Sequence, residues 1–252
     1  MAVSMLMCRS LLNERGREVL LYLRFLKTVI NEDAGLHLPR ENATAPIDRD
    51  LTHTLKANGY LLIYNLVEAT MTMAITDIHR AMRCDMAAGL DDMTLDCLNP
   101  ALFERVLRRF KEGASDKLSG SYPSSGAWLV KYWLDDHDQA VRNNKNPLAS
   151  GNLDGQKIVE MAKKYGFDTY GREDQMKHPG LYKAKEKRNA LAHGKTSFKD
   201  CGMDTSVDLL LEEGVGVLRC LRHHVRAVEA FIAQRGYVRP PRAVAAPPLQ
   251  PA

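Results

Sequence analysis

Apolar residues recur every three or four positions along most of the chain, which is the spacing of an amphipathic α-helix. The first such run contains Val19, Leu23, Leu26 and Ile30, and Gly35 follows its end. A polar connection with two prolines, from Leu38 to Asp48, separates this helix from the next. No stretch of any length alternates with the two-residue period of a strand. The pattern therefore predicts an all-α protein.

The second helix is expected from about Asp50 to Met82, and it is apolar nearly all round, as the central helix of a bundle is. Its polar residues follow steps of three, four and seven, which places them on one seam: Asn58, Asn65, Glu68, Thr72, Thr76 and His79. The stretch 59–75 is apolar enough to resemble a membrane span. An ionised Glu68 at its centre would be unfavourable in hydrocarbon, so a buried helix in a soluble bundle is favoured.

Periodicity is weaker between Cys84 and Asn152. Helices are expected at 101–112 and 127–141, with a loop rich in glycine and serine at 113–125 between them. This region is interpreted as a helical insertion between the second long helix and the later helices.

Three further helices are expected after the insertion. The first spans 154–165, the second runs from Leu181 to His193 after a loop with Pro179 and Gly180, and the last spans 206–234. Gly214 and Gly216 lie inside the last helix and predict a close helix contact there. The chain is therefore expected to form one antiparallel helical domain over residues 1–238, with the insertion at 84–152 and a disordered Pro- and Ala-rich tail at 239–252.

Composition and charge indicate the expected cellular compartment. The net charge is +4, which permits an anionic partner without requiring one. Five cysteines are scattered without a CxxC pair, which favours reduced thiols in a cytoplasmic protein. Arg9, Glu14 and Arg15 interrupt the apolar N-terminus before a secretory signal can form. No membrane association is expected.

The segment from Lys183 to Gly194 carries the most chemistry. Asn189 and His193 are four residues apart and share one helix face, and the long side chain of Arg188 can curl toward the same space. His193 occupies the last turn, where the carbonyl end of the helix favours a protonated imidazole. Such a histidine can give a proton to a leaving oxygen.

The charge around this helix points the same way. Between residues 177 and 199 there are six lysines and one arginine against one acidic residue, a net charge of +6, so the rest of the chain is net negative. Phosphate contacts are the natural use of such a patch.

Ordinary structural roles compete with these interpretations. An arginine and a histidine on a helix are more often a surface charge and a cap than a catalytic pair, and Glu68 could be a structural carboxylate bonded to Arg188. Asp135, Asp136, His137 and Asp138 could bind a metal, but consecutive positions point in different directions on a helix. Neither His223 with His224 nor Trp128 with Trp133 is a stronger signal.

The run Arg188-Asn-Ala-Leu-Ala-His193-Gly resembles the RxxxxH signature of the HEPN superfamily, which includes many prokaryotic toxin and phage-defence ribonucleases. The segment Leu61-Leu-Ile-Tyr-Asn-Leu-Val-Glu-Ala-Thr70 resembles the Tyr-Asn-x-x-Glu helix of a toxin-like branch. The resemblance extends to Ile158–Phe167, to Ser197-Phe198 and to the closing helix up to Tyr237. It covers residues 10 to 237, with the insertion matching only loosely.

This resemblance implies a helical bundle that dimerises with its two motifs facing each other and cleaves RNA without a metal or other cofactor. Arg188 would contact the scissile phosphate, His193 would transfer protons, and Asn189 would orient either one. Glu68 is expected to hold Arg188 or Asn189. The remaining supporting residues are Asn65, Lys187, Lys195 and Ser197.

A dimer also has a chemical rationale. Attack by a 2′-hydroxyl needs one group to take a proton and another to give one, and two copies of the chain supply two histidines. RNA should yield a 2′,3′-cyclic phosphate, and DNA should be inert. Lys195 stands where HEPN toxins paired with minimal nucleotidyltransferase antitoxins carry a tyrosine, so inactivation by AMPylation there is not expected.

The expected function is a homodimeric endoribonuclease that acts as a toxin or phage-defence effector, with RNA and an antitoxin or defence protein as partners. Two alternatives stay open. One is a HEPN protein that binds RNA or nucleotide, or scaffolds a partner, without cleavage. The other is a helical interaction protein in which the motif is incidental.

Overall fold

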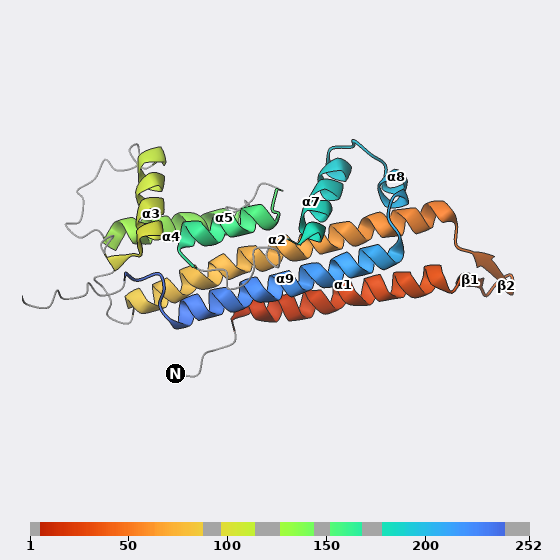
Figure 1. The fold of residues 1–252 in the computed structure, drawn as a ribbon, viewed down its shortest axis with the longest axis horizontal. Coiled ribbons are helices and arrows are strands. Elements are labelled where there is room, and N and C mark those ends of the chain that lie inside the picture. Colours follow the sequence, from red (N-terminus) through yellow and green to blue (C-terminus); the bar gives the residue numbers. More distant parts are fainter. Residues whose placement is uncertain (1–5, 88–96, 114–126, 144–151, 168–177, 240–252) are drawn as a thin grey trace, which may run out of the picture.

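Three long helices form the body of the molecule (Figure 1). The computed structural model describes residues 6–87, 97–113, 127–143, 152–167 and 178–239. Helices α1 (Met7–Asn31), α2 (Arg49–Ala87) and α9 (Val207–Ala233) lie side by side, and α7 (Pro179–Ala192) and α8 (Phe198–Met203) pack on α2. The predicted all-α bundle is confirmed.

Close packing of the long helices depends on glycines. A Cβ atom at Gly59 or Gly214 would meet methyl groups of Leu23, and one at Gly216 would meet the ring of His178. The predicted close helix contact at Gly214 and Gly216 is therefore confirmed. These positions keep α2 near the centre of the core, with Tyr60, Tyr64 and Ile75 fully buried.

The helix α2 is long and apolar enough to cross a membrane by length and composition. It is the only such helix among the residues that the structure describes. However, 56% of its most apolar window is buried inside the bundle, as expected for the central helix of a core.

The insertion contains α3 (Pro100–Gly113) and α4 (Ala127–Arg142), and α5 (Gly155–Tyr165) follows it (Figure 1). Asn99 joins this part to the rest of the chain. Its side-chain oxygen accepts the N–H of Leu102 and caps α3, while its amide nitrogen donates to the carbonyls of Tyr165 (3.0 Å) and Gly236 (2.8 Å). The insertion is therefore anchored to both α5 and the end of α9.

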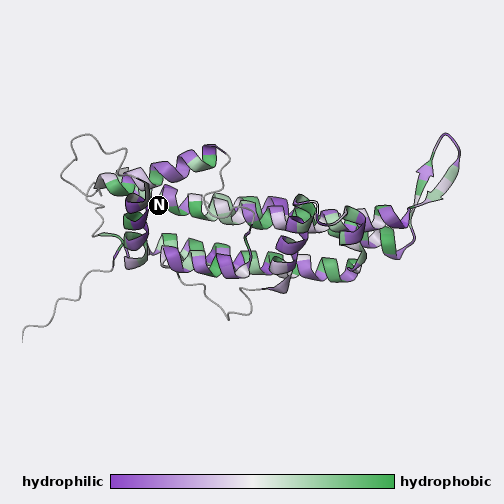
Figure 2. Cartoon of the chain, turned by 90° about the horizontal axis from the view of Figure 1, so that it is seen from above, coloured by the Kyte–Doolittle hydropathy of each residue, from purple (hydrophilic) through white to green (hydrophobic). Residues whose placement is uncertain are grey.

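A small hairpin overlaps the predicted polar connection between the first two long helices. Strands β1 (Gly35–Leu38) and β2 (Ala43–Pro46) pair antiparallel, with Gly35 opposite Pro46 and Leu38 opposite Ala43. They project beyond the end of the bundle (Figure 2). Only one residue of the two strands is even partly buried, so no apolar alternation marks them and the backbone pairing alone defines them.

Two predicted segments cannot be compared with the structure. Residues 114–125 of the Gly- and Ser-rich loop and the tail after Arg239 lie outside the described residues. None of the five cysteines, all of which are described, is in a disulfide.

Candidate functional site on the motif helix

The helix that carries the motif begins and ends on well-defined caps. His178 is its N-cap and accepts the N–H of Gly180, and Pro179 is the first helical residue. Pro179 and Gly180 therefore belong to the helix and not to the preceding loop, which corrects the predicted start. Gly194 follows the end with φ of +64°, and the N–H of Lys195 donates to the carbonyl of Ala190. The predicted stop at Gly194 is confirmed.

Two lysines of this helix form ion pairs with α9 and with the N-cap of α5. Lys183 pairs with Glu213 of α9 (3.0 Å), a carboxylate that also accepts the hydroxyl of buried Tyr60. Lys185 pairs with Asp154, the N-cap of α5, at 2.8 Å.

Two more cations of the predicted basic patch are also engaged. Lys187 donates to the carbonyl of Cys201 in α8 (2.7 Å), and Lys199 pairs with Asp50 (2.7 Å). Acidic residues from other elements thus offset much of the +6 charge of the segment. The positive field at this surface is smaller than the sequence predicts.

Arg188 lies over the ring of Tyr64, with its guanidinium carbon 5.1 Å from the ring centre. It also donates to the side-chain oxygen of Asn189 at 3.0 Å. Burial, together with the nearby carboxylate of Glu68, raises the pKa of Tyr64 to about 12, while the N–H of Leu153 and the charge of Arg188 oppose the rise. Tyr64 therefore stays neutral at physiological pH and offers its ring face to the cation.

Asn189 is held from the other side by the segment that precedes α5. Its amide nitrogen donates to the side-chain oxygen of Asn152 (2.9 Å), and the N–H of Leu153 donates to the hydroxyl of Tyr64 (3.3 Å). One short segment thus contacts both neighbours of Arg188. Asn152 lies in the weakly patterned region and was not among the predicted site residues, and Tyr64 was indicated only by the family resemblance.

His193 is the C-cap residue of α7, and its side chain is exposed. Its backbone N–H donates to the carbonyl of Asn189 (3.1 Å), so the backbone is ordered while the imidazole faces solvent. The same helix end therefore presents an exposed imidazole one turn beyond Asn189.

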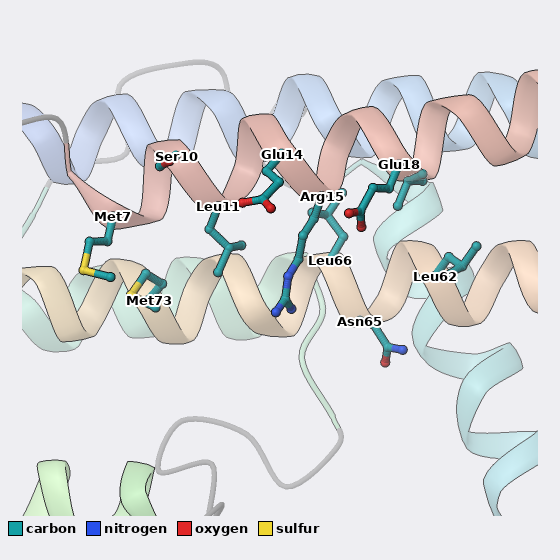
Figure 3. Close-up of a pocket in the computed structure, with 11 residues that line it drawn as sticks. Met7, Ser10, Leu11, Glu14, Arg15, Glu18, Leu62, Asn65, Leu66 and Met73 are labelled. Atoms are coloured by element: carbon teal, nitrogen blue, oxygen red, sulfur yellow. The ribbon is translucent and has the colours of Figure 1, made fainter.

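A pocket of about 230 Å³ adjoins Arg188. Its lining residues come from α2, α7 and α8: Leu61, Asn65, Arg188, Leu191, Ala192 and Phe198. Asn65 also borders a groove of about 760 Å³ between α1 and α2, where it lies on the side of α2 away from α1 (Figure 3). The groove has an apolar floor that includes Leu62 and Leu66, and charged residues of α1 at its rim.

The supporting residues occupy different places. Asn65 lines the pocket, and Glu68 lies beside the hydroxyl of Tyr64. Lys195 is exposed just after the helix. Ser197 caps α8 by accepting the N–H of Asp200, so this contact serves the next helix and not the pocket.

The acidic run at 135–138 is used in ion pairs. Asp135 and Asp138 both face Arg83, and Asp136 pairs with Arg109. Trp133 of the same helix is buried. Within the described ranges, no three His, Cys, Asp or Glu side chains are grouped to hold a metal ion.

Comparison with known proteins gives one result. A family described as HEPN_MAE_28990-like HEPN matches residues 10–237. No curated protein and no solved structure matches the chain.

Proposed function

Because the chain belongs to the HEPN_MAE_28990-like HEPN family, we propose that it is a metal-independent endoribonuclease whose site is completed by a second copy. The observation that carries this proposal is the fixed Arg188, held by Tyr64 and Asn189 beside a pocket, with the exposed His193 at the same helix end. The family match supports membership of a nuclease-type superfamily. The site contains an arginine and a histidine, which are the residue types that the proposed cleavage needs.

In the proposed reaction, the neutral His193 of one copy takes the proton of a 2′-hydroxyl. The oxygen attacks phosphorus, the bond to the 5′-oxygen breaks, and the protonated His193 of the other copy gives that oxygen its proton. Arg188 stabilises the charge on the phosphate oxygens in the transition state. The products are a 2′,3′-cyclic phosphate and a 5′-hydroxyl end.

Glu68 and Asn189 are positioning residues in this scheme. Asn189 links Arg188 to Asn152, and Glu68 acts on the same group through Tyr64. Lys195 is exposed beside the histidine and available to the RNA backbone, whereas Lys187 and Ser197 support the site by holding and capping α8.

The surface next to the site supports association with a second copy. Phe198, which lines the Arg188 pocket, is 39% exposed, and Leu62, which lines the neighbouring groove, is 37% exposed. Asn65 borders both cavities, so the apolar surface is continuous with the site. A dimer that covered these side chains would also bring two motif helices together.

By resemblance to the toxin-like branch, the proposed role is that of a toxin or phage-defence effector in the cytoplasm, controlled by an antitoxin or a defence partner protein. The rival role is that of a HEPN protein that binds RNA or scaffolds a partner without cutting. The engagement of all three α7 lysines in structural contacts is the observation that favours this rival.

The test is cleavage of single-stranded RNA by the purified chain in excess EDTA. We expect new ends that are 2′,3′-cyclic phosphates, an unchanged rate on chelation, and no cleavage of DNA of the same sequence. Arg188→Ala should slow cleavage by about 10²-fold or more because it removes transition-state stabilisation. RNA binding without new ends would support the binding role, and cleavage that requires added Mg²⁺ would contradict the mechanism.

A further inference from the structure

Another cavity of about 430 Å³ is lined mainly by residues of the insertion. The insertion helices α3 and α4 lie away from α7 and α8 (Figure 1). The walls of this cavity come from α3 and α4, and Tyr165 of α5 contributes to its base. The lining includes the guanidinium groups of Arg105 and Arg109, the carboxylate of Asp136, and the rings of Trp133 and His137. Its volume is within the range of small-molecule sites in proteins.

The base of this cavity is uncharged. The ring of buried His79 lies 4.4 Å from Trp133 and 4.1 Å from His137, and its Nε2 is 2.9 Å from the hydroxyl of Tyr165. Burial lowers the pKa of His137 to about 4 and that of His79 well below its usual value, and the nearby arginines act in the same direction. Both rings are therefore neutral at neutral pH.

The arginines around the cavity differ in their partners. Arg109 donates two hydrogen bonds to Asp136 (2.9 and 3.1 Å), and Arg83 pairs with Asp135 and Asp138. Arg105 has no carboxylate within ion-pairing distance among the described residues, and lies over the ring of Tyr165 at 4.9 Å. It is half-buried at the cavity wall, where a cation without a counter-ion is unfavourable.

Two buried nitrogen atoms on the same walls also lack hydrogen bonds. They are Nε of Arg105 and Nε2 of His137, a side chain only 5% exposed, and neither makes a hydrogen bond within the described part of the chain. Buried polar atoms in native proteins are normally satisfied. An anionic hydrogen-bond acceptor in the cavity would satisfy both nitrogen atoms and would balance the charge of Arg105.

We propose that this cavity binds a small phosphorylated organic molecule, with Arg105 as the main contact of its phosphate and His137 as a neutral donor beside it. Arg109, already paired with Asp136, forms the outer wall. The volume leaves room for an organic group beyond the phosphate, next to the aromatic base. The site is separate from the motif helix and does not depend on cleavage of RNA.

The test uses the full chain and isothermal titration calorimetry with phenyl phosphate, inorganic phosphate and phenol. We expect phenyl phosphate to bind with a Kd below about 1 mM, inorganic phosphate more weakly, and phenol at least about tenfold more weakly than phenyl phosphate. Equal binding of phenol and phenyl phosphate, or no binding of phenyl phosphate at millimolar concentration, would overturn the proposal.

Variants locate the site. Arg105→Gln should weaken phenyl phosphate at least about tenfold, whereas Arg108→Gln, an exposed neighbour outside the cavity lining, should not change it. Arg188→Ala should also bind normally, which separates this site from the motif helix. The melting temperature of Arg105→Gln without ligand should change little, because the removed cation has no carboxylate partner among the described residues and loses only its contact with the ring of Tyr165. Loss of binding in Arg188→Ala, or unchanged binding in Arg105→Gln, would contradict the assignment.

Discussion

His193→Ala is expected to lower the rate of RNA cleavage by about 10³-fold or more, because both proton transfers depend on this side chain. The melting temperature should stay the same, since the imidazole is exposed and only the backbone of His193 caps α7. His37→Ala is the matched control, because His37 is an exposed histidine of the hairpin. Cleavage rates and thermal melts of the three proteins measure both effects. Retained cleavage in His193→Ala would remove the proposed chemistry.

Mixed dimers test whether two copies act on one phosphate. When wild-type and His193→Ala chains are refolded together in equal amounts, about one quarter of random dimers carry two histidines. Cleavage per chain should therefore fall to about one quarter of the wild-type value. A fall to only about one half would mean that each chain acts alone.

Expression in a host provides an independent readout of the same substitution. The wild-type chain should be toxic and the His193→Ala chain should not be, if RNA cleavage is the source of toxicity. Equal toxicity of the two chains, or none from either, would favour the binding or scaffold role.

Asn99→Ala is expected to lower the free energy of unfolding by about 3–5 kcal/mol, the largest effect of a single polar truncation away from the motif. The change removes the cap of α3, worth about 1 kcal/mol, and leaves the carbonyls of Tyr165 and Gly236 without their donor, at about 1–2 kcal/mol each. The melting temperature should fall by roughly 10 °C for a chain of this length.

Two further variants separate the contributions of Asn99. Asn99→Asp keeps an oxygen to cap α3 but replaces the donor with a carboxylate facing two carbonyls, so it should be at least as destabilising. Asn13→Ala, an exposed position in α1, should change stability by less than about 0.5 kcal/mol. A loss below about 1 kcal/mol in Asn99→Ala would show that the amide does not hold these elements together.

The helical fold could be predicted because apolar residues recur every three or four positions in long stretches of the chain. The expected helix at 154–165 begins and ends where the structure has α5, with Asp154 as cap and Gly166 after it. The hairpin could not be predicted in this way, because its strands are four residues long and their side chains are exposed. The predicted start of α7 is wrong because proline and glycine commonly mark loops, whereas Pro179 here occupies the first turn of the helix, a position that proline favours.

The site could be predicted only in part, for physical reasons. Arg188, Asn189 and His193 lie close in sequence, so helical spacing relates them directly. The partners that hold them, Tyr64 and Asn152, come from distant segments, so helical spacing within the motif cannot predict them. The charge of the patch was overestimated for a similar reason, because Glu213, Asp154 and Asp50 approach only in the folded chain.

The way the motif helix is attached has a consequence for its local stability. Only Gly180, Leu181 and Ala184 of α7 are buried. Ion pairs therefore contribute more to the attachment of α7 than to that of α2 and α9, which bury many apolar side chains. Elements with little buried apolar surface open at lower free energy than the core, and added salt weakens the pairs that restrain them. Amide hydrogens of α7 should thus exchange faster than those of α2, with the gap widening at high ionic strength.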